Sequence, residues 1–245
     1  MKTKHFKTID NTTNELQLFC FPYAGGNGSI YYPWREKIDK NIELISVQLA
    51  GRATLYAEEP ITNLDVLVEK LYREIEPYLD RPFAFFGHSM GGLIAYALMA
   101  HIERVSDKRA EFIIISATKL PSYYATMEDY LLSDKDLTER LKKNGATPKE
   151  VLDSKELMDI ILPIYRADCK LLATNNIAKE KIKTKAFIFN SEEDVEKEVM
   201  MEWQEYFTQK IEYLNFDGGH FFIHKQEREV IEKINDISQK RLAVY

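Results

Sequence analysis

The sequence has few of the residues that cross-link a chain or bind metal ions. Cys20 and Cys169 are its only cysteines, and they form no CxxC pair. A disulfide framework needs more cysteines, so we expect two reduced thiols in a reducing cytoplasm. His220 and His224 have the i, i+4 spacing of a metal pair, but neither an HExxH glutamate nor a third ligand accompanies them. We therefore expect neither a metal ion nor another cofactor.

Long hydrophobic runs and an excess of positive charge are also absent. No apolar stretch approaches the about 20 residues of a transmembrane helix. The first residues, Met1–Asn14, are polar and lack the apolar core of a signal peptide, so we expect a cytoplasmic protein with no membrane role. The formal net charge of −6 argues against a nucleic-acid binder, because phosphate contacts need clustered lysines and arginines. No stretch indicates a subunit interface, and we expect a monomer.

The apolar residues that are present suffice for one large core. Hydrophobic residues make up 45% of the 245 residues, which fits a single domain spanning 1–245. Short apolar runs alternate with amphipathic segments, which predicts an α/β fold with a mainly parallel sheet flanked by helices. The expected strands are Leu16–Phe21, Ile42–Leu49, Phe83–Phe86, Phe112–Ser116, Ala186–Asn190 and Ile211–Phe216. The expected helices of this scaffold are Ile30–Lys40, Leu64–Leu79, Leu93–Arg104, Val199–Phe207 and Glu227–Ile237.

The strand pattern stops between Ala117 and about Lys183. Four helical segments replace it, namely Met127–Lys143, Pro148–Leu152, Lys155–Leu162 and Pro163–Thr174. The stretch is too long for a plain connection, so we interpret residues 118–183 as a helical lid inserted into the scaffold. Some of its apolar side chains could face a substrate, although packing between helices is their commoner use. These candidates are Met127, Leu131, Leu132, Leu141, Leu157, Met158, Ile161, Leu162 and Tyr165.

A G-x-S-x-G motif occupies residues 87–91, between the apolar run Phe83–Phe86 and an apolar helical stretch that starts at Leu93. Strand, tight turn and helix are the context of a nucleophile elbow, in which the serine projects from a strained turn. The glycines let other chain segments pass close by. Ser89 is therefore the candidate nucleophile, and the Met90 N–H is free to donate to an oxyanion. A chance match to so short a motif is the alternative.

A glycine-rich loop, Pro22–Gly28, follows the first predicted core strand. It lacks the G-x-x-x-x-G-K-[ST] spacing of a phosphate loop and has no G-x-G-x-x-G in register. Hydrolases of the α/β type take a second oxyanion-hole N–H from an early loop of this kind. The loop therefore predicts that Ala24 or Tyr23 supplies that N–H, and a plain tight turn is the alternative.

A serine needs a base to take its proton, and histidine is the usual one. Among the five histidines, His220 alone lies on a Gly-Gly loop after the last predicted strand, and we assign it as the base. His5 lies in a polar tail, and His101 ends the helix after the elbow. His88 lies inside the elbow, where its side chain should point away from that of Ser89.

The base needs a carboxylate to orient it, and the chain order serine, acid, histidine is that of α/β hydrolases. Asp194 follows the penultimate strand, where the acid is expected, and we favour it. Glu193 is the next choice, and Glu192 also lies in the loop. Asp217 is only three residues before His220, which is too local for the usual geometry. Ligands of such folds bind at the carboxyl ends of the strands, where all these residues should lie.

With these residues assigned, the chain resembles the type II thioesterases of nonribosomal peptide and polyketide synthesis over almost its whole length. The lid run and the Phe-Pro-Tyr-Ala-Gly-Gly loop are more specific than G-x-S-x-G, which many hydrolases share. The matching stretches are L-F-C-F-P-Y-A-G-G (Leu18–Gly26), R-P-F-A-F-F-G-H-S-M-G-G (Arg81–Gly92), T-P-K-E-V-L (Thr147–Leu152), E-L-M (Glu156–Met158), L-P-I-Y-R-A-D (Leu162–Asp168) and F-D-G-G-H-F-F (Phe216–Phe222).

The resemblance implies an editing hydrolase that cleaves wrong or stalled acyl groups from the phosphopantetheine thiol of acyl or peptidyl carrier protein domains. By matching position, Ser89, Asp194 and His220 carry over as its triad. Two departures stand out. The family commonly has Leu-Pro-Gly-Arg where this chain has Leu49-Ala50-Gly51-Arg52, and its acid loop usually opens with glycine where Ser191 stands here. The alternatives are a carboxylesterase, lipase or acyltransferase with the same triad, and a non-catalytic module that docks carrier domains.

Overall fold

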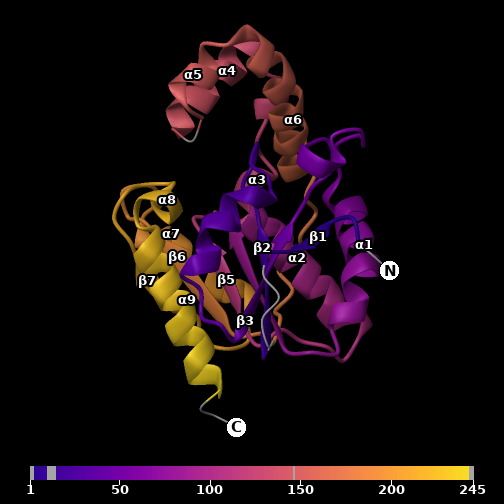
Figure 1. Ribbon diagram of the computed structural model, residues 1–245, viewed down its shortest axis with the longest axis vertical. Helices are drawn as coiled ribbons and strands as arrows, with labels where there is room; N and C mark the ends of the chain where they lie inside the picture. The colour runs from indigo at the N-terminus through magenta and orange to yellow at the C-terminus, as the bar shows by residue number, and fades with distance from the viewer. Residues whose placement is uncertain (1–2, 10–14, 146, 243–245) are drawn as a thin grey trace.

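The computed structural model describes residues 3–9, 15–145 and 147–242 and contains one central sheet (Figure 1). The described strands lie in the order β1-β3-β2-β4-β5-β6-β7, and among them only β1 is antiparallel to its neighbour. The strands are β1 (Phe6–Thr8), β2 (Leu16–Phe21), β3 (Ile42–Val47), β4 (Phe83–His88), β5 (Ile113–Ser116), β6 (Ala186–Asn190) and β7 (Glu212–Asn215). This confirms the predicted mainly parallel α/β-hydrolase sheet.

Helices cover both faces of the sheet and its carboxyl edge (Figure 1). The α-helices are α1 (Leu64–Ile75), α2 (Met90–Val105), α3 (Pro121–Tyr124), α4 (Asp134–Asn144), α5 (Lys149–Leu152), α6 (Lys155–Ala173), α7 (Lys197–Met201), α8 (Phe222–Lys225) and α9 (Glu227–Leu242). The 3-10 helices are η1 (Gly28–Glu36), η2 (Ala53–Leu55), η3 (Glu76–Tyr78), η4 (Asp129–Leu131) and η5 (Glu202–Tyr206). Among the described residues, no helix is both long and apolar enough to cross a membrane.

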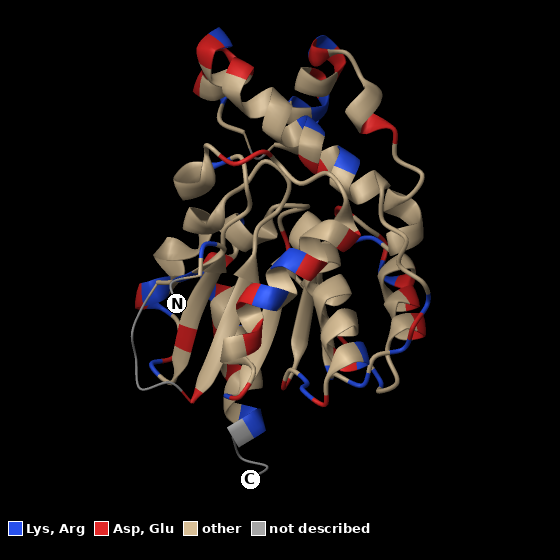
Figure 2. Ribbon diagram, turned by 90° about the vertical axis from the view of Figure 1, so that its right-hand side faces the viewer, with Lys and Arg blue, Asp and Glu red and all other residues tan. Residues whose placement is uncertain are grey.

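Alternation along the strands divides the core into two layers, because successive side chains of a strand point to opposite faces. Phe19 and Phe85 are register partners on the face covered by α1 and α2. Cys20 and Phe86 are partners on the other face, which η1, α8 and α9 cover. All four side chains are fully buried. Figure 2 shows that lysines and arginines alternate with aspartates and glutamates along the helices visible in this view.

The segment from α3 to α6, which connects β5 to β6, we call the helical insertion (residues 121–173). Its helices α4 to α6 lie beyond the carboxyl ends of the strands (Figure 1). They form a small apolar cluster of their own, separate from the two layers that pack on the sheet. Its buried members are Leu137, Leu141, Met158, Leu162, Tyr165 and Cys169. The insertion is thus a packed unit resting on the edge where a ligand of this fold binds.

Some predicted elements differ from the observed ones. Phe6–Thr8 was expected to lie in a polar tail, but these residues pair with β3 as the edge strand β1. The expected helix Ile30–Lys40 is the 3-10 helix η1, which contains Pro33. The expected helix Met127–Lys143 is wrong in its first turns, because α4 begins only after the cap Ser133.

Pro163 was expected to separate two helices, but α6 runs through it. A proline inside a helix removes one hydrogen bond and is normally disruptive. Met158, Leu162, Tyr165 and Cys169 lie on both sides of Pro163 at helical spacing and are all buried in the insertion's cluster. Packing of this single apolar face holds the helix together across the proline.

Candidate active site

Ser89 lies between the end of β4 and the first residue of α2, in a conformation that L-residues rarely adopt (φ +54°, ψ −119°). Its neighbouring glycines make room for that turn. A Cβ on Gly87 would lie 2.2 Å from the carbonyl oxygen of Gly91, and one on Gly91 would lie 2.1 Å from that of Phe21. The strained turn therefore needs both glycines, as the motif predicted, and strain of this kind is found at functional sites.

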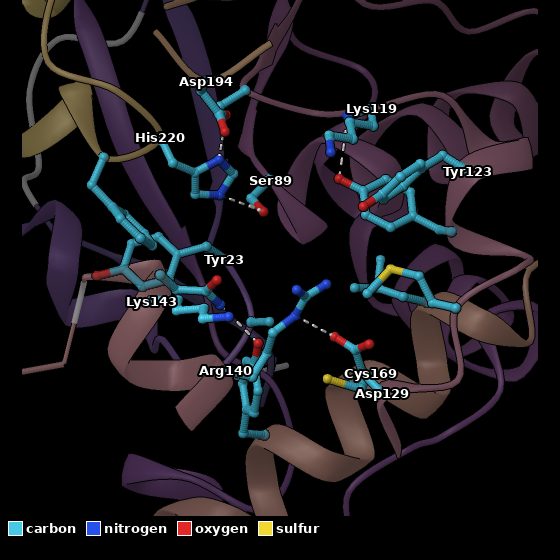
Figure 3. A pocket seen from close by; sticks show the side chains of 18 residues that line it. Tyr23, Ser89, Lys119, Tyr123, Asp129, Arg140, Lys143, Cys169, Asp194 and His220 are labelled. Atoms are coloured by element: carbon cyan, nitrogen blue, oxygen red, sulfur yellow. Dashed lines mark hydrogen bonds and ion pairs between the residues drawn. The ribbon is translucent and has the colours of Figure 1, made fainter. Parts of the chain in front are cut away.

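His220 and Asp194 complete a chain of contacts with Ser89 (Figure 3). The Nε2 atom of His220 lies 3.0 Å from Oγ of Ser89, and its Nδ1 atom lies 2.6 Å from Oδ2 of Asp194. The side chains of His220 and Asp194 are 30% and 20% exposed, so the pair is reachable from solvent yet largely shielded. The fold thus brings together three residues that span 131 positions of the sequence.

The other acid candidates have different partners. A carboxylate oxygen of Glu193 accepts the Gly218 N–H at 3.2 Å, and Glu192 accepts the hydroxyl of Tyr213 at 3.4 Å. Asp217 does not line the pocket around Ser89. Of the four carboxylates considered, Asp194 is the one in contact with His220.

Ser191, which stands where the resembling family usually has glycine, links the acid loop to the histidine loop. Its Oγ accepts the N–H of Gly219 at 3.1 Å, and its carbonyl oxygen accepts the N–H of Asp194 at 2.9 Å. The first bond ties the two loops together, and the second fixes the turn that carries Asp194 within its own loop. The serine therefore adds a side-chain bond that glycine lacks.

The backbone amides of Met90 and Ala24 were predicted to donate to an oxyanion, and the structure gives the surroundings of both residues. Met90 is the first residue of α2, and the first N–H groups of a helix have no acceptor within the helix. Ala24 lines the pocket beside Ser89. The hydroxyl of Tyr23, the alternative residue in this loop, lies 3.0 Å from Nε2 of His224.

The remaining histidines have structural contacts. His5, expected in a polar tail, is fully buried, and its Nδ1 lies 2.7 Å from Oε1 of Glu74. His88 is also fully buried, and its Nδ1 lies 2.8 Å from Oγ of Ser116. Burial, with the neighbouring His220 and His224, holds the pKa of His88 well below its usual value. His88 is therefore a neutral imidazole packed beneath the His220 loop.

A buried ion pair beside the glycine-rich loop was missed in the sequence. Arg52 donates from both terminal nitrogens to the carboxylate of Asp168, at 2.7 and 2.6 Å. Arg52 also donates to the carbonyl oxygen of Gly26 at 3.1 Å, and Asp168 accepts the N–H of Gly25 at 2.7 Å. The pair thus fastens α6 to the loop that contains Ala24. Both residues lie in stretches that align with the resembling family, which was the available signal.

A pocket of about 280 Å³ opens above Ser89, between the carboxyl edge of the sheet and the helical insertion. Of the apolar insertion residues that could have faced a substrate, Met127 and Tyr165 line it. Leu141, Met158 and Leu162 are instead buried in the insertion's own cluster. Leu131 and Leu157 are 65% and 43% exposed. Helix–helix packing therefore accounts for most of these side chains.

No group of three or more His, Cys, Asp or Glu in the described parts of the chain is arranged to hold a metal ion. Cys20 and Cys169 are buried free thiols. Burial raises the pKa of the Cys169 thiol to about 12, so this pocket-lining group is protonated near neutral pH.

Comparisons with known proteins identify the family of this chain. The family model described as "Thioesterase domain" matches residues 16–238. The gramicidin S biosynthesis protein GrsT of Aneurinibacillus migulanus is 35% identical over 226 residues, covering 91% of this chain and 88% of GrsT.

Two solved structures share the fold. The type II thioesterase BorB from the borrelidin biosynthetic cluster has a TM-score of 0.86 at 26% identity, covering 95% of this chain and 97% of BorB. ClbQ from the colibactin nonribosomal peptide and polyketide pathway has a TM-score of 0.86 at 27% identity, covering 94% and 100% of the two chains. With this match across most of its length, the chain belongs to the thioesterase domain family and is an enzyme that hydrolyses thioesters.

Proposed function

We propose that this protein is a type II editing thioesterase, which hydrolyses aberrant or stalled acyl groups from the phosphopantetheine thiol of carrier proteins in nonribosomal peptide or polyketide biosynthesis. The observation that carries the proposal is the continuous contact from Ser89 through His220 to Asp194. The gramicidin S protein, BorB and ClbQ support the choice of pathway. The acyl or peptidyl carrier domain is the partner, and it brings the phosphopantetheine, so the enzyme needs no cofactor of its own.

In the proposed mechanism Ser89 attacks the thioester carbonyl while Nε2 of His220 takes the hydroxyl proton. Asp194 stabilises the imidazolium that forms, and the amides of Ala24 and Met90 donate to the oxyanion. The tetrahedral intermediate expels the pantetheine thiolate, which takes the proton from His220. A water molecule then gives a proton to His220 and attacks the acyl-enzyme. The second tetrahedral intermediate collapses, the leaving Ser89 oxygen takes the proton back from His220, and the free acid is released. The carrier thiol is regenerated.

We further propose that the helical insertion acts as a lid of a single monomeric domain. It provides much of the pocket wall over Ser89, including Tyr124, Arg140 and Tyr165. A carrier-borne acyl group has to pass between this wall and the sheet to reach Ser89. Movement of the insertion would then set how fast substrates enter and products leave.

The proposal is tested by intact-protein mass spectrometry of an acetyl-loaded carrier domain incubated with the enzyme. The parent should remove the acetyl group, and Ser89→Ala should leave it in place. Ser122→Ala, which changes an exposed serine of α3, is the matched control and should keep full activity. If the parent spares the acetyl-carrier but hydrolyses a simple oxyester, the carboxylesterase alternative is correct. Binding of the carrier without turnover would instead indicate a docking module.

A further inference from the structure

The wall of the pocket around Ser89 contains several basic side chains. Three basic side chains line the pocket, namely Lys119, Arg140 and Lys143, against the two carboxylates of Asp129 and Asp194. Burial raises the pKa of the lining tyrosines Tyr124 and Tyr165 and of Cys169, which leaves these groups neutral near pH 7. The pocket therefore has an excess of positive charge, although the whole chain has a net charge of −6.

Both carboxylates are already engaged. Asp194 contacts His220, and Oδ2 of Asp129 accepts the Nε–H of Arg140 at 2.8 Å. The latter bond fixes Arg140 by one edge of its guanidinium. Figure 3 shows the two terminal nitrogens pointing into the middle of the pocket, in the direction of Ser89. Within the described part of the chain these nitrogens, like the ammonium groups of Lys119 and Lys143, have no carboxylate partner.

A guanidinium held at Nε presents its terminal N–H groups as a preorganised fork, which suits a carboxylate or phosphate. Resting on the proposed thioesterase function, we propose that Arg140, supported by Lys143 and Lys119, is an anion subsite that selects acyl groups ending in a carboxylate. Such substrates are half-thioesters of dicarboxylic acids. An acyl group with a free ammonium would be repelled by the same residues.

The phosphate of the carrier's prosthetic group has the same chemistry, but the dimensions favour the acyl carboxylate. Ser89 and Arg140 line one pocket of about 280 Å³. The phosphate is separated from the thioester by the whole pantetheine arm, whereas a carboxylate at the end of a short acyl chain lies within the same pocket as the reacting carbonyl. We therefore expect the subsite to bind the carboxylate of the acyl group.

The test uses matched pairs of thioesters, malonyl against acetoacetyl and adipyl against 6-oxoheptanoyl. Each pair has the same shape and differs in the terminal carboxylate. The kcat/KM ratio of charged to neutral substrate is compared between variants, so differences in intrinsic reactivity cancel. Arg140→Gln should lower this ratio by about 10-fold or more, as expected for losing a charge-assisted hydrogen bond. Arg140→Lys keeps the charge but loses the two-pronged geometry of the guanidinium. Its kcat/KM ratio should lie between the ratios of the parent and of Arg140→Gln. Lys142→Gln, on the same helix but paired with Glu139, should match the parent.

Each pair is measured on pantetheine and on phosphopantetheine, to separate the two sources of an anion. The proposal requires that the enzyme prefer the acyl group with the terminal carboxylate on both pantetheine and phosphopantetheine. A different outcome is that the parent prefers phosphopantetheine thioesters whatever the acyl group, and that Arg140→Gln loses this preference. That outcome would show that Arg140 binds the phosphate, and it would overturn the proposal. An unchanged ratio in Arg140→Gln would also overturn it. An acetyl-loaded carrier domain is the reference substrate, because its resistance to the parent enzyme would refute the proposed thioesterase function itself.

Discussion

The carboxylate of Asp168 and the guanidinium of Arg52 form a buried two-pronged ion pair, although 116 positions separate them in the sequence. Their side chains are 3% and 6% exposed. The pair also bonds to the backbone of the glycine-rich loop. Asp168 accepts the Gly25 N–H, and Arg52 donates to the Gly26 carbonyl oxygen. The amide of Ala24, one residue earlier, is thereby held at the pocket, and the helix α6 is tied to the same point.

Asp168→Ala is expected to lower both stability and turnover. Removing one partner of a buried ion pair leaves an uncompensated charge and costs about 3–5 kcal/mol. Urea unfolding measures that loss, and kcat for acetyl-pantetheine measures the displacement of the Ala24 amide. The double variant Arg52→Met/Asp168→Leu should regain stability but not kcat, since the Gly25 N–H still lacks its acceptor. Recovery of kcat in the double variant would show that the pair only stabilises the fold.

The two adjacent acids of the catalytic loop should differ sharply in effect. Asp194→Asn keeps the shape of the side chain but favours the wrong histidine tautomer, and kcat should drop by about 10⁴-fold. Glu193→Gln, whose side chain can still accept the Gly218 N–H, is the matched control and should change kcat little. The measurement is kcat for hydrolysis of one thioester by the parent and by both variants. An Asp194→Asn variant as active as the parent would transfer the role to Glu193.

Removing the proposed base tests the other half of the pair. His220→Ala should abolish most turnover, because Ser89 then has no group to take its proton. The fold should remain intact, since the His220 side chain is 30% exposed. Circular dichroism and thermal unfolding check the fold, and thioester hydrolysis checks the activity. Substantial turnover by a folded His220→Ala protein would contradict the assignment.

Gly91→Ala should destabilise the protein more than an alanine at a glycine in open space. The added Cβ would lie 2.1 Å from the carbonyl oxygen of Phe21, a backbone atom that cannot rotate away. Overpacking of this kind costs about 1–3 kcal/mol and occasionally more. Gly145→Ala is the control, because its Cβ meets nothing within 4 Å, and only its φ of +75° is unfavourable, by about 1–2 kcal/mol. Equal stability of Gly91→Ala and the parent in urea would contradict the close packing of the elbow against Phe21.

Acid should weaken the fold through His88. Its folded pKa lies below the unfolded value of about 6.5, so the unfolded chain binds the proton first as pH falls. The stability present above pH 6.5 is then lost toward pH 5, at up to about 1.4 kcal/mol per pH unit for this group. Burial is the main cause, and nearby His220 and His224 add to it.

The check is urea unfolding of the parent and of His88→Asn between pH 7 and pH 5. The variant should show a shallower dependence of the unfolding free energy on pH, whatever its absolute stability. Burial also lowers the pKa values of His101 and His224, so a smaller slope should persist. Identical slopes in the two proteins would mean that His88 is not the acid-sensitive group.

The sequence by itself determined the strands of the described sheet other than the short edge strand β1, and it determined the elbow and the order of the catalytic candidates. These are local properties. Short continuous apolar runs mark strands that are buried on both faces, and the glycines at 87 and 91 permit the strained turn at Ser89. The loop positions of Ser89 and His220 after their strands then place them on one edge of a parallel sheet. The prediction that the helix ends before Pro163 was wrong, because a rule based on local sequence does not include the packing that stabilises α6.

Tertiary structure alone decided which distant side chains meet. Asp194 rather than its neighbours reaches His220 because the loops after β6 and β7 are fixed relative to each other by the sheet and by Ser191. Arg52 finds Asp168, and Arg140 turns toward Ser89, only because the helical insertion folds back over the strands' carboxyl ends. The spacing of apolar residues predicts the backbone conformation of one segment. Distances between segments are set by packing, which no local pattern contains.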